Sequence, residues 1–386
     1  MVLALTLAAL LAGIAFLHPY ISYPLSLSMM WARPVRRVAA GDSIAPRPSA
    51  TLLFSAYNEE RALKPKLANL EAIKAFHPDL EILAYSDMST DGTLALLESR
   101  PDLLRVIPTR ERTGKAMGMR RMVAEAKGEI CIFTDANVML DVKSIPALAR
   151  YYADPDVGCV CGHLVYTNGN EAASQTASNG SLYWRLEEHI KQLESETGSL
   201  MGADGSIFSI RRSLHHPPPA DIIDDMYVSF SILCDGYRIV RAPDVIAYEE
   251  SVTVAREEFR RKVRIACQAF NVHRLMWPRL RQLDAFNLYK YVSHKLLRWF
   301  VLLWVALSAA SFCLFLFSVG FGWLAVALIL AIAVGVLAGD RLKLGPVPQL
   351  VDIFYAFAAT ALGVWRSVKG DRFQTWTPAQ SIRKQQ

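Results

Sequence analysis

The stretch EILAYSDMSTDGT (residues 81–93) reads as a short buried strand that ends in a polar, acidic loop. The same pattern occurs before it, in TLLFSAYNEE (51–60), and after it, in EICIFTDAN (129–137). Pieces with helical spacing lie between these strands at 60–76 and 113–127, and a further short strand is expected at 103–107. Strand–helix alternation of this kind predicts an α/β fold with an open, mostly parallel sheet covered by helices.

The polar loops mark the expected site. In open α/β sheets, ligands bind beyond the carboxyl ends of the strands. The clusters AYNEE (56–60), SDMSTDGT (86–93) and FTDAN (133–137) each follow a strand directly. We therefore expect their side chains to gather at one edge of the sheet.

The two ends of the chain read as membrane segments. Apolar residues make up 52% of the 386 residues, and they concentrate at the ends. Residues 1–31 form a nearly continuous apolar run, and 299–319 and 323–338 are each about long enough for a ~30 Å hydrocarbon layer. Arginines and lysines flank these runs on one side, which predicts an outside N-terminus and a cytoplasmic middle region. The stretch 347–364 is expected to be interfacial or re-entrant, because spanning would leave the basic C-terminal residues outside.

These patterns predict a multi-pass protein of the cell membrane with its catalytic domain in the cytoplasm. The expected layout is an N-terminal anchor (1–31), a globular domain (40–255), basic interfacial helices (256–298), two transmembrane helices (299–338), and a third hydrophobic segment with a basic tail (347–386).

The charge and the cysteine content narrow the class of protein and its compartment. The net charge of +6 resides mainly beside the hydrophobic segments, which favours contact with membrane lipids and not with nucleic acid. The six cysteines show no C-x-x-C pair, and most lie in apolar runs where a reduced thiol packs as a small hydrophobe. A reducing compartment is expected.

The acidic loops allow more than one interpretation. Asp87, at the end of a strand, is placed to accept hydrogen bonds from a base or ribose. Asp91 either binds substrate or caps the following helix, since Asp satisfies free backbone N–H groups there. Asp224 and Asp225 either favour a helix N-terminus or include a base that deprotonates an acceptor hydroxyl.

The loop after the fourth strand suggests a metal site. Asp135 and Asn137 offer the oxygen ligands that Mg²⁺ or Mn²⁺ prefers, and such an ion would stabilise a departing diphosphate. Lys115 either pairs with the same phosphates or is a solvated residue at a helix start. The arginines of 256–264 either clamp a diphosphate or face lipid headgroups.

Taken together, the order and spacing of these pieces resemble the family 2 glycosyltransferases, an inverting group that includes cellulose, chitin and hyaluronan synthases. The matching pieces are FSAYNEE (54–60), SDMSTDGT (86–93), TGKA (113–116), FTDAN (133–137), GADGSIFSIRR (202–212), DD (224–225) and RRKVR (260–264).

This resemblance implies a GT-A type fold with a Rossmann-like nucleotide-sugar domain, flanked by transmembrane helices at both ends. It implies a role for each site residue. Tyr57, Glu59, Asp87 and Asp91 would contact the nucleoside part, Lys115 the diphosphate, and Asp135 and Asn137 a divalent cation, while Asp204 would line the acceptor side. Asp225 would be the general base with Asp224 beside it, and Arg261 and Arg264 would bind phosphate.

Two departures from the family pattern bear on the product. Asn137 replaces the second carboxylate of the D-x-D metal motif, and RKVRI (261–265) lacks the Gln and Trp of the Q-x-x-R-W motif. Residues 374–383, with Trp376, faintly resemble the C-terminal gating segment of some relatives. The missing Trp and the few hydrophobic segments favour addition of one sugar over polymer export.

Three functions remain open at this point. The preferred one is a membrane-bound transferase that moves a sugar from a nucleoside-diphosphate sugar to a lipid-linked or saccharide acceptor. The alternatives are a processive exopolysaccharide synthase and a non-catalytic membrane subunit that binds a nucleotide-sugar.

Overall fold

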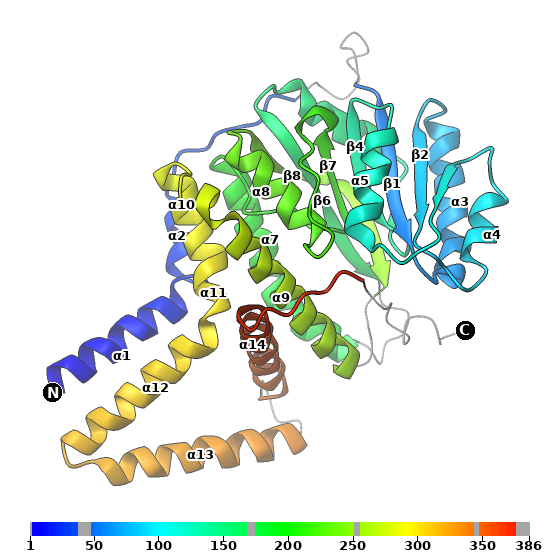
Figure 1. Ribbon diagram of the computed structural model, residues 1–386. Helices are drawn as coiled ribbons and strands as arrows, with labels where there is room; N and C mark the ends of the chain where they lie inside the picture. Colours follow the sequence, from blue (N-terminus) through cyan, green and yellow to red (C-terminus); the bar gives the residue numbers. More distant parts are fainter. Residues whose placement is uncertain (1, 38–47, 168–173, 251–254, 343–346, 376–386) are drawn as a thin grey trace.

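One eight-stranded sheet organises the middle of the chain in the computed structural model, which describes residues 2–37, 48–167, 174–250, 255–342 and 347–375 (Figure 1). The strand order is β3-β2-β1-β4-β7-β6-β8-β5. The strands are β1 (Ala50–Ala56), β2 (Glu81–Ser86), β3 (Arg105–Pro108), β4 (Ile130–Asp135), β5 (Met139–Leu140), β6 (Val157–Thr167), β7 (Ile207–Arg211) and β8 (Arg238–Glu250).

The strands that carry the polar loops run parallel and adjacent. β1 pairs in parallel with β2 on one side and with β4 on the other, and β3 continues the parallel set beyond β2. Ala56 lies opposite Ser86, and Ser55 opposite Asp135. The three polar loops therefore emerge at one edge of the sheet, as the sequence predicts.

The other half of the sheet is mixed. β7 lies antiparallel between β4 and β6, β8 is parallel to β6, and the short β5 pairs antiparallel with β8. The prediction of an α/β fold with a mostly parallel sheet is confirmed, and strands β5 to β8 are additions that the alternation pattern did not reveal.

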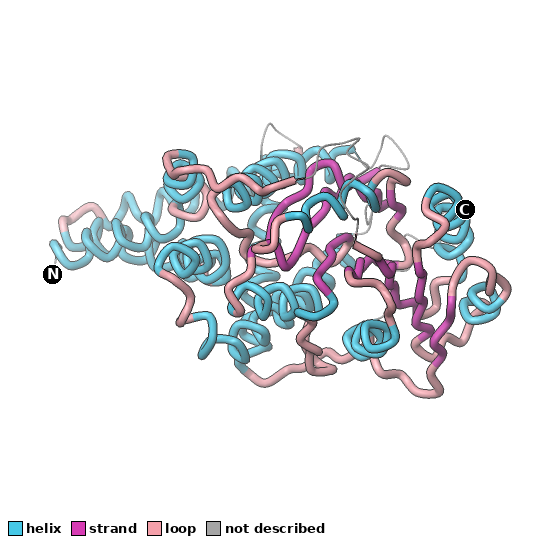
Figure 2. The backbone as a smooth tube through the Cα atoms, turned by 90° about the horizontal axis from the view of Figure 1, so that it is seen from above, coloured by secondary structure: helices cyan, strands magenta, loops and turns pink. Residues whose placement is uncertain are grey.

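Helices lie on both sides of the sheet (Figure 2). They are α3 (Glu60–Phe76), α4 (Thr93–Glu98), α5 (Lys115–Glu125), α6 (Ser144–Ala149), α7 (Ser174–Glu196), α8 (Asp224–Cys234) and α9 (Ala255–Leu280). Alternate strand residues supply two cores, because successive side chains of a strand point to opposite faces. Leu52 and Phe54 pack with α3 residues such as Leu67, whereas Leu53 packs with α5 residues such as Met119.

Two expected boundaries differ from the structure. The helix expected at 113–127 begins only at Lys115. Gly114 has a φ of +85°, which is not a helical value, so the helix cannot include it. The first C-terminal span, expected from Trp299, begins at Val301 as α12. Trp299 is itself buried and packs edge-on against Phe270, so it belongs to the globular part.

The apolar ends form long helices. α12 (Val301–Ser318), α13 (Gly322–Arg341) and α14 (Val347–Val368) each contain a stretch long and apolar enough to cross a membrane. α1 (Val2–Leu17) and α2 (Ser22–Ser28) form a pair bent by 56° that could make a fourth. α1 lies along α12, where Ser308 donates a hydrogen bond to the Ala9 carbonyl at 3.3 Å (Figure 1).

Helix α14 returns to the globular part and packs along α9. The two helices approach closely at Gly363, where an added Cβ would lie 2.6 Å from the Ala266 Cβ. The interfacial or re-entrant placement of 347–364 stays a prediction. The following residues 371–375 run toward the sheet edge, whereas Trp376 and the basic residues up to Lys384 lie outside the described residues.

Candidate active site

A cavity of about 1720 Å³ opens at the carboxyl edge of the sheet. Its lining brings together segments that are far apart in the sequence: the ends of β1, β4 and β8, the starts of α5 and α8, and parts of α7, α9 and the C-terminal segment. Of the predicted site residues, Glu59, Lys115, Asp135, Asn137, Asp204, Asp224, Asp225, Arg261 and Arg264 line this cavity.

Lys115 is the central cation of this cavity. The positive φ of Gly114 starts α5 directly at the sheet edge, so the first side chain of the helix reaches across to β4. Its Nζ lies 2.6 Å from Asp135 Oδ1 and 3.9 Å from Asp224 Oδ2. Asp224 Oδ2 is buried and accepts no hydrogen bond from the described residues. Lys115 therefore joins the predicted metal and base positions.

Asp225 lies in the first turn of α8 against the loop 202–206. An added Cβ on Gly205 would lie 2.6 Å from Asp225 Oδ2, so only glycine leaves room for this carboxylate. Its Oδ1 accepts a hydrogen bond from the Met226 N–H at 2.6 Å. Burial first, and then the neighbouring Asp224 charge, raise the pKa of Asp225 to about 7, although Lys115 opposes the rise. A carboxylate with a pKa near neutral is suited to accept a proton.

Asp135, the last residue of β4, and Asn137 form the predicted position of a divalent cation. Asn137 Nδ2 donates to Glu249 Oε1 at 3.1 Å, which leaves its amide oxygen out of that bond. Burial, reinforced by the Asp135 charge and opposed by Arg261, raises the pKa of Glu249 to about 7. Nowhere in the described ranges do three or more His, Cys, Asp or Glu side chains converge to hold a metal. Asp135 Oδ1 is paired with Lys115 Nζ at 2.6 Å, and binding of a cation by Asp135 and Asn137 stays a prediction.

Asp87 lies behind the cavity wall. Its side chain is fully buried, and its oxygens accept hydrogen bonds from the Thr113 N–H (2.8 Å) and the Gly114 N–H (3.1 Å), with Arg112 Nε at 3.1 Å. In this structure Asp87 holds the loop that presents Lys115. Its predicted contact with a base or ribose stays a prediction.

Asp91 has the contacts of a helix cap. Its Oδ1 accepts from the Thr93 N–H at 3.0 Å, at the start of α4, and its Oδ2 from the Glu60 N–H at 3.3 Å, at the start of α3. The contacts of Asp91 in this structure are therefore those of a helix cap. Its substrate-binding role is an untested prediction.

Tyr57 stacks on Arg112, whose guanidinium carbon lies 3.2 Å from the ring centroid. Glu59 is buried and belongs to the cavity lining, and its backbone N–H donates to Thr93 Oγ1 at 2.8 Å. Among the described residues that line the cavity, Tyr57 does not appear, so its predicted contact with the nucleoside is untested.

The arginines of α9 face the same space. Arg264 Nη1 donates to Gln268 Oε1 at 3.2 Å, and Gln268 Nε2 donates to the Phe373 carbonyl at 2.9 Å. Gln268 thereby ties Arg264 to the C-terminal segment. The sequence signal for it was its i, i+4 spacing from Arg264, since residues four apart lie on the same helix face.

The sequence analysis missed several charged residues of the cavity, among them Lys191, Glu249 and Lys295. Glu249 could have been predicted by the rule that ligands bind beyond the carboxyl ends of strands, because it lies near the end of β8. Lys191 and Lys295 come from helices, and no local pattern distinguishes them from solvated lysines.

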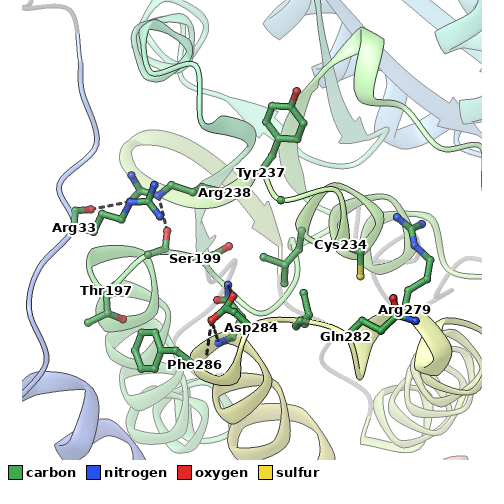
Figure 3. A pocket seen from close by; sticks show the side chains of 15 residues that line it. Arg33, Thr197, Ser199, Cys234, Tyr237, Arg238, Arg279, Gln282, Asp284 and Phe286 are labelled. Carbon is green, nitrogen blue, oxygen red and sulfur yellow. Dashed lines mark hydrogen bonds between the residues drawn. The ribbon is translucent and has the colours of Figure 1, made fainter.

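A second hollow of about 470 Å³ lies where the N-terminal linker meets α10 (Ala285–Tyr291) (Figure 3). Its arginines already have partners: Arg238 donates to the Arg33 carbonyl at 2.7 Å, Arg33 pairs with Asp156 at 2.8 Å, and Arg279 with Asp235 at 2.7 Å. The two contacts of Arg33 fasten the N-terminal segment to the globular part, and the Arg279–Asp235 pair joins α9 to the end of α8.

Comparisons with known proteins agree with this geometry. The sequence model of the family "Glycosyl transferase family 2" matches residues 51–216. An N-acetylglucosaminyltransferase of Rhizobium meliloti (strain 1021) is 22% identical over 290 residues, which cover 70% of this chain and 68% of the relative. One of Bradyrhizobium diazoefficiens is 23% identical over 185 residues, which cover 45% of this chain but only 38% of the relative.

Among solved structures, the mannosyltransferase PcManGT from Pyrobaculum calidifontis, in complex with GDP-Man and Mn²⁺, superposes with a TM-score of 0.72. The match covers 95% of this chain and 99% of that one at 21% sequence identity. At this identity the likeness shows the fold, which is of the GT-A type.

The fold, the cavity and the matched domain together define a nucleotide-sugar transferase. Residues 51–216 carry a family 2 glycosyltransferase domain. The domain match and the relatives named N-acetylglucosaminyltransferase support a transferase over a non-catalytic subunit.

Proposed function

We propose that this protein is a membrane-bound, inverting glycosyltransferase that adds one sugar from a nucleoside-diphosphate sugar to a lipid-linked or saccharide acceptor. The observation that carries this proposal is the arrangement around Lys115. The Lys115 ammonium lies between two carboxylates. One is that of Asp135, on the proposed donor side, and the other is that of Asp224, next to the proposed base Asp225.

Asp225 acts as the general base. It takes the proton of the acceptor hydroxyl as the acceptor oxygen forms its bond to the anomeric carbon. The bond from that carbon to the diphosphate oxygen breaks in the same step, so the electron pair leaves with the nucleoside diphosphate. A single in-line displacement inverts the configuration of the anomeric carbon. The raised pKa of Asp225 supports this role, because it matches proton uptake near neutral pH.

Lys115 and Arg264 stabilise the departing diphosphate. Both line the cavity on the side of Asp135, and Gln268 holds the Arg264 guanidinium in place. Asp135 and Asn137 are the residues that would hold a Mg²⁺ or Mn²⁺ ion, which when bound supplies further positive charge to the diphosphate. The Mn²⁺ bound with GDP-Man in PcManGT supports this expectation.

Addition of one sugar is favoured over processive synthesis. Ile265 lines the cavity where the Q-x-x-R-W motif would place its Trp. An isoleucine lacks the flat ring on which the terminal sugar of a growing chain stacks.

The apolar helices support placement in the cell membrane as a multi-pass protein with a cytoplasmic catalytic domain. The layout proposed from the sequence is retained: an anchor at 1–31, a catalytic domain at 40–255, basic helices at 256–298, and hydrophobic segments after 299. The basic residues beside these segments would contact anionic lipid headgroups.

Incubation of membranes that contain the protein with radiolabelled nucleotide-sugars tests the proposal. Nucleotide-activated N-acetylglucosamine and GDP-mannose are the first donors to try, because the relatives and PcManGT suggest them. We expect one lipid-soluble adduct of inverted configuration. A ladder of products would identify a processive enzyme instead, and a product of retained configuration would overturn the single displacement.

A further inference from the structure

A π-helical turn, Val292–Leu296, connects α10 to α11 (Leu297–Trp299) at the start of the C-terminal hydrophobic helices. A π-turn contains one residue more than an α-turn, and such turns are frequent at functional sites. This one carries two basic residues, His294 and Lys295. Their side chains have very different surroundings.

His294 is locked between two glutamates of α7. Its Nδ1 lies 2.7 Å from Glu194 Oε1, and its Nε2 lies 2.9 Å from Glu187 Oε1. Arg298 holds the other oxygen of Glu187 at 2.5 Å, and the Tyr23 hydroxyl donates to Glu194 at 2.5 Å. These contacts fix the turn relative to α7 and to the N-terminal α2.

Lys295, the next residue, lines the active-site cavity. Its ammonium makes no hydrogen bond or ion pair with any residue in the described part of the chain. Glu187 and Glu194 attract it electrostatically, and both carboxylates are already hydrogen-bonded to His294. Lys295 thus lines the cavity as a cation that two glutamates attract but that makes no direct contact with them among the described residues.

The place of Lys295 relative to the proposed base is set by the loop 202–206. The Lys295 Cε lies 4.0 Å from the Cβ position of Gly202, at one end of the loop. Gly205, near the other end, is in contact with Asp225. Three residues span at most ~10 Å. Lys295 and the proposed base Asp225 therefore contact the same short loop of the cavity.

We propose that Lys295 binds a phosphate group of the acceptor, so that the acceptor is a sugar linked to a lipid through phosphate. This inference rests on the proposed function and names its substrate class. A lysine ammonium recognises phosphate as a point charge. A neutral glycolipid would cover Lys295 without pairing it, and burial of an unpaired charge is unfavourable.

The test compares two acceptors in phosphatidylcholine vesicles: a polyprenyl diphosphate that carries one sugar, and an alkyl glycoside of the same sugar. The variants are Lys295→Met and Lys295→Arg, with Lys262→Met as the matched control. Lys262 lies on α9, outside the described lining of the cavity, and it is half-exposed beside Glu258.

We expect the wild type to prefer the diphosphate acceptor. Lys295→Met should raise KM for that acceptor roughly 10- to 100-fold, as for loss of a charged hydrogen bond. KM for the nucleotide-sugar and for the alkyl glycoside should not change. Lys295→Arg should restore part of the loss, and Lys262→Met should behave as the wild type. An equal KM for both acceptors, or an unchanged KM in Lys295→Met, would overturn the proposal.

Two further measurements separate this inference from the proposed function. Thermal stabilisation of the detergent-solubilised protein by polyprenyl phosphate, without donor, should be present in the wild type and lost in Lys295→Met. This binding measurement tests the role of Lys295 even if no sugar transfer occurs. A lack of transfer would overturn only the proposed function. Vesicles with added phosphatidylglycerol identify the source of the phosphate: competition by this lipid at equal concentration would mean that Lys295 binds bulk headgroups and not the acceptor.

Discussion

Replacement of Asp225 by Asn should abolish sugar transfer and stabilise the protein at the same time. Asn keeps the shape of the side chain and removes its ability to take a proton. General-base catalysis contributes typically ~10²- to 10⁴-fold, so kcat should fall by about that factor. KM for the nucleotide-sugar should stay nearly unchanged, because Lys115 and Asp135 remain in place.

The effect on stability follows from the pKa of Asp225. Burial and Asp224 raise this pKa from the ordinary 3.8 to about 7. The protonated form therefore fits the folded state better, and its contribution to stability is full below pH 3.8 and is lost as the pH rises to 7. Each pH unit in that window lowers the free energy of unfolding by up to ~1.4 kcal/mol, or about 4 kcal/mol in all. An asparagine at position 225 stays neutral, so the free energy of unfolding of the variant does not fall in this way.

Thermal unfolding in detergent at pH 4 and pH 8, with transfer assays alongside, measures both effects. Asp225→Asn should unfold at a higher temperature than the wild type at pH 8 and at nearly the same temperature at pH 4. Asp235→Asn is the matched control, because Asp235 follows the other end of α8 and pairs with Arg279 outside the cavity. The wild-type kcat/KM should rise tenfold per pH unit below pH 7 and level off above it. Near-normal turnover of Asp225→Asn, or an equal gain in stability at both pH values, would refute the assignment.

Other residues of the cavity give predictions that kinetics and unfolding can check. Lys115→Met should raise KM for the nucleotide-sugar roughly 10- to 100-fold through loss of a charged contact to the diphosphate; an unchanged KM in a radiolabel transfer assay would contradict the role of Lys115. Removal of divalent cations by a chelator should abolish transfer, and Asn137→Asp should lower the Mn²⁺ concentration needed to restore it, since the site gains a carboxylate; transfer that persists in excess chelator would exclude the metal role of Asp135. Asp91→Ala should lower the free energy of unfolding by about 0.5–2 kcal/mol through lost helix caps and leave KM for the donor nearly unchanged; a large rise in that KM would instead support substrate binding by Asp91.

Local sequence determined the parallel half of the fold. The apolar runs at 51–55, 81–85 and 129–133 are buried on both faces, and a strand in that position needs an apolar side chain at nearly every residue. Such runs can be recognised without knowledge of their neighbours. The polar loops that follow them were then expected at one edge, since parallel strands end together.

The mixed half of the sheet needed the tertiary structure. β7 enters between β4 and β6 from a segment that lies more than 70 residues beyond β4 in the chain. No local pattern states which strand a new strand will join. The same holds for Lys115, which reaches Asp135 and Asp224 only because α5 begins at the sheet edge.

The sequence by itself determined which residue types stand after each strand, and hence the class of chemistry that this protein performs. Only the tertiary structure separated Asp87 and Asp91, which hold a loop and cap helices, from Asp135 and Asp225, which line the cavity. It also brought Lys295 into the same cavity. The reason is physical: backbone propensity and apolar spacing act within a few residues, whereas burial, pairing and the pKa of a carboxylate depend on neighbours that only the packed chain brings together.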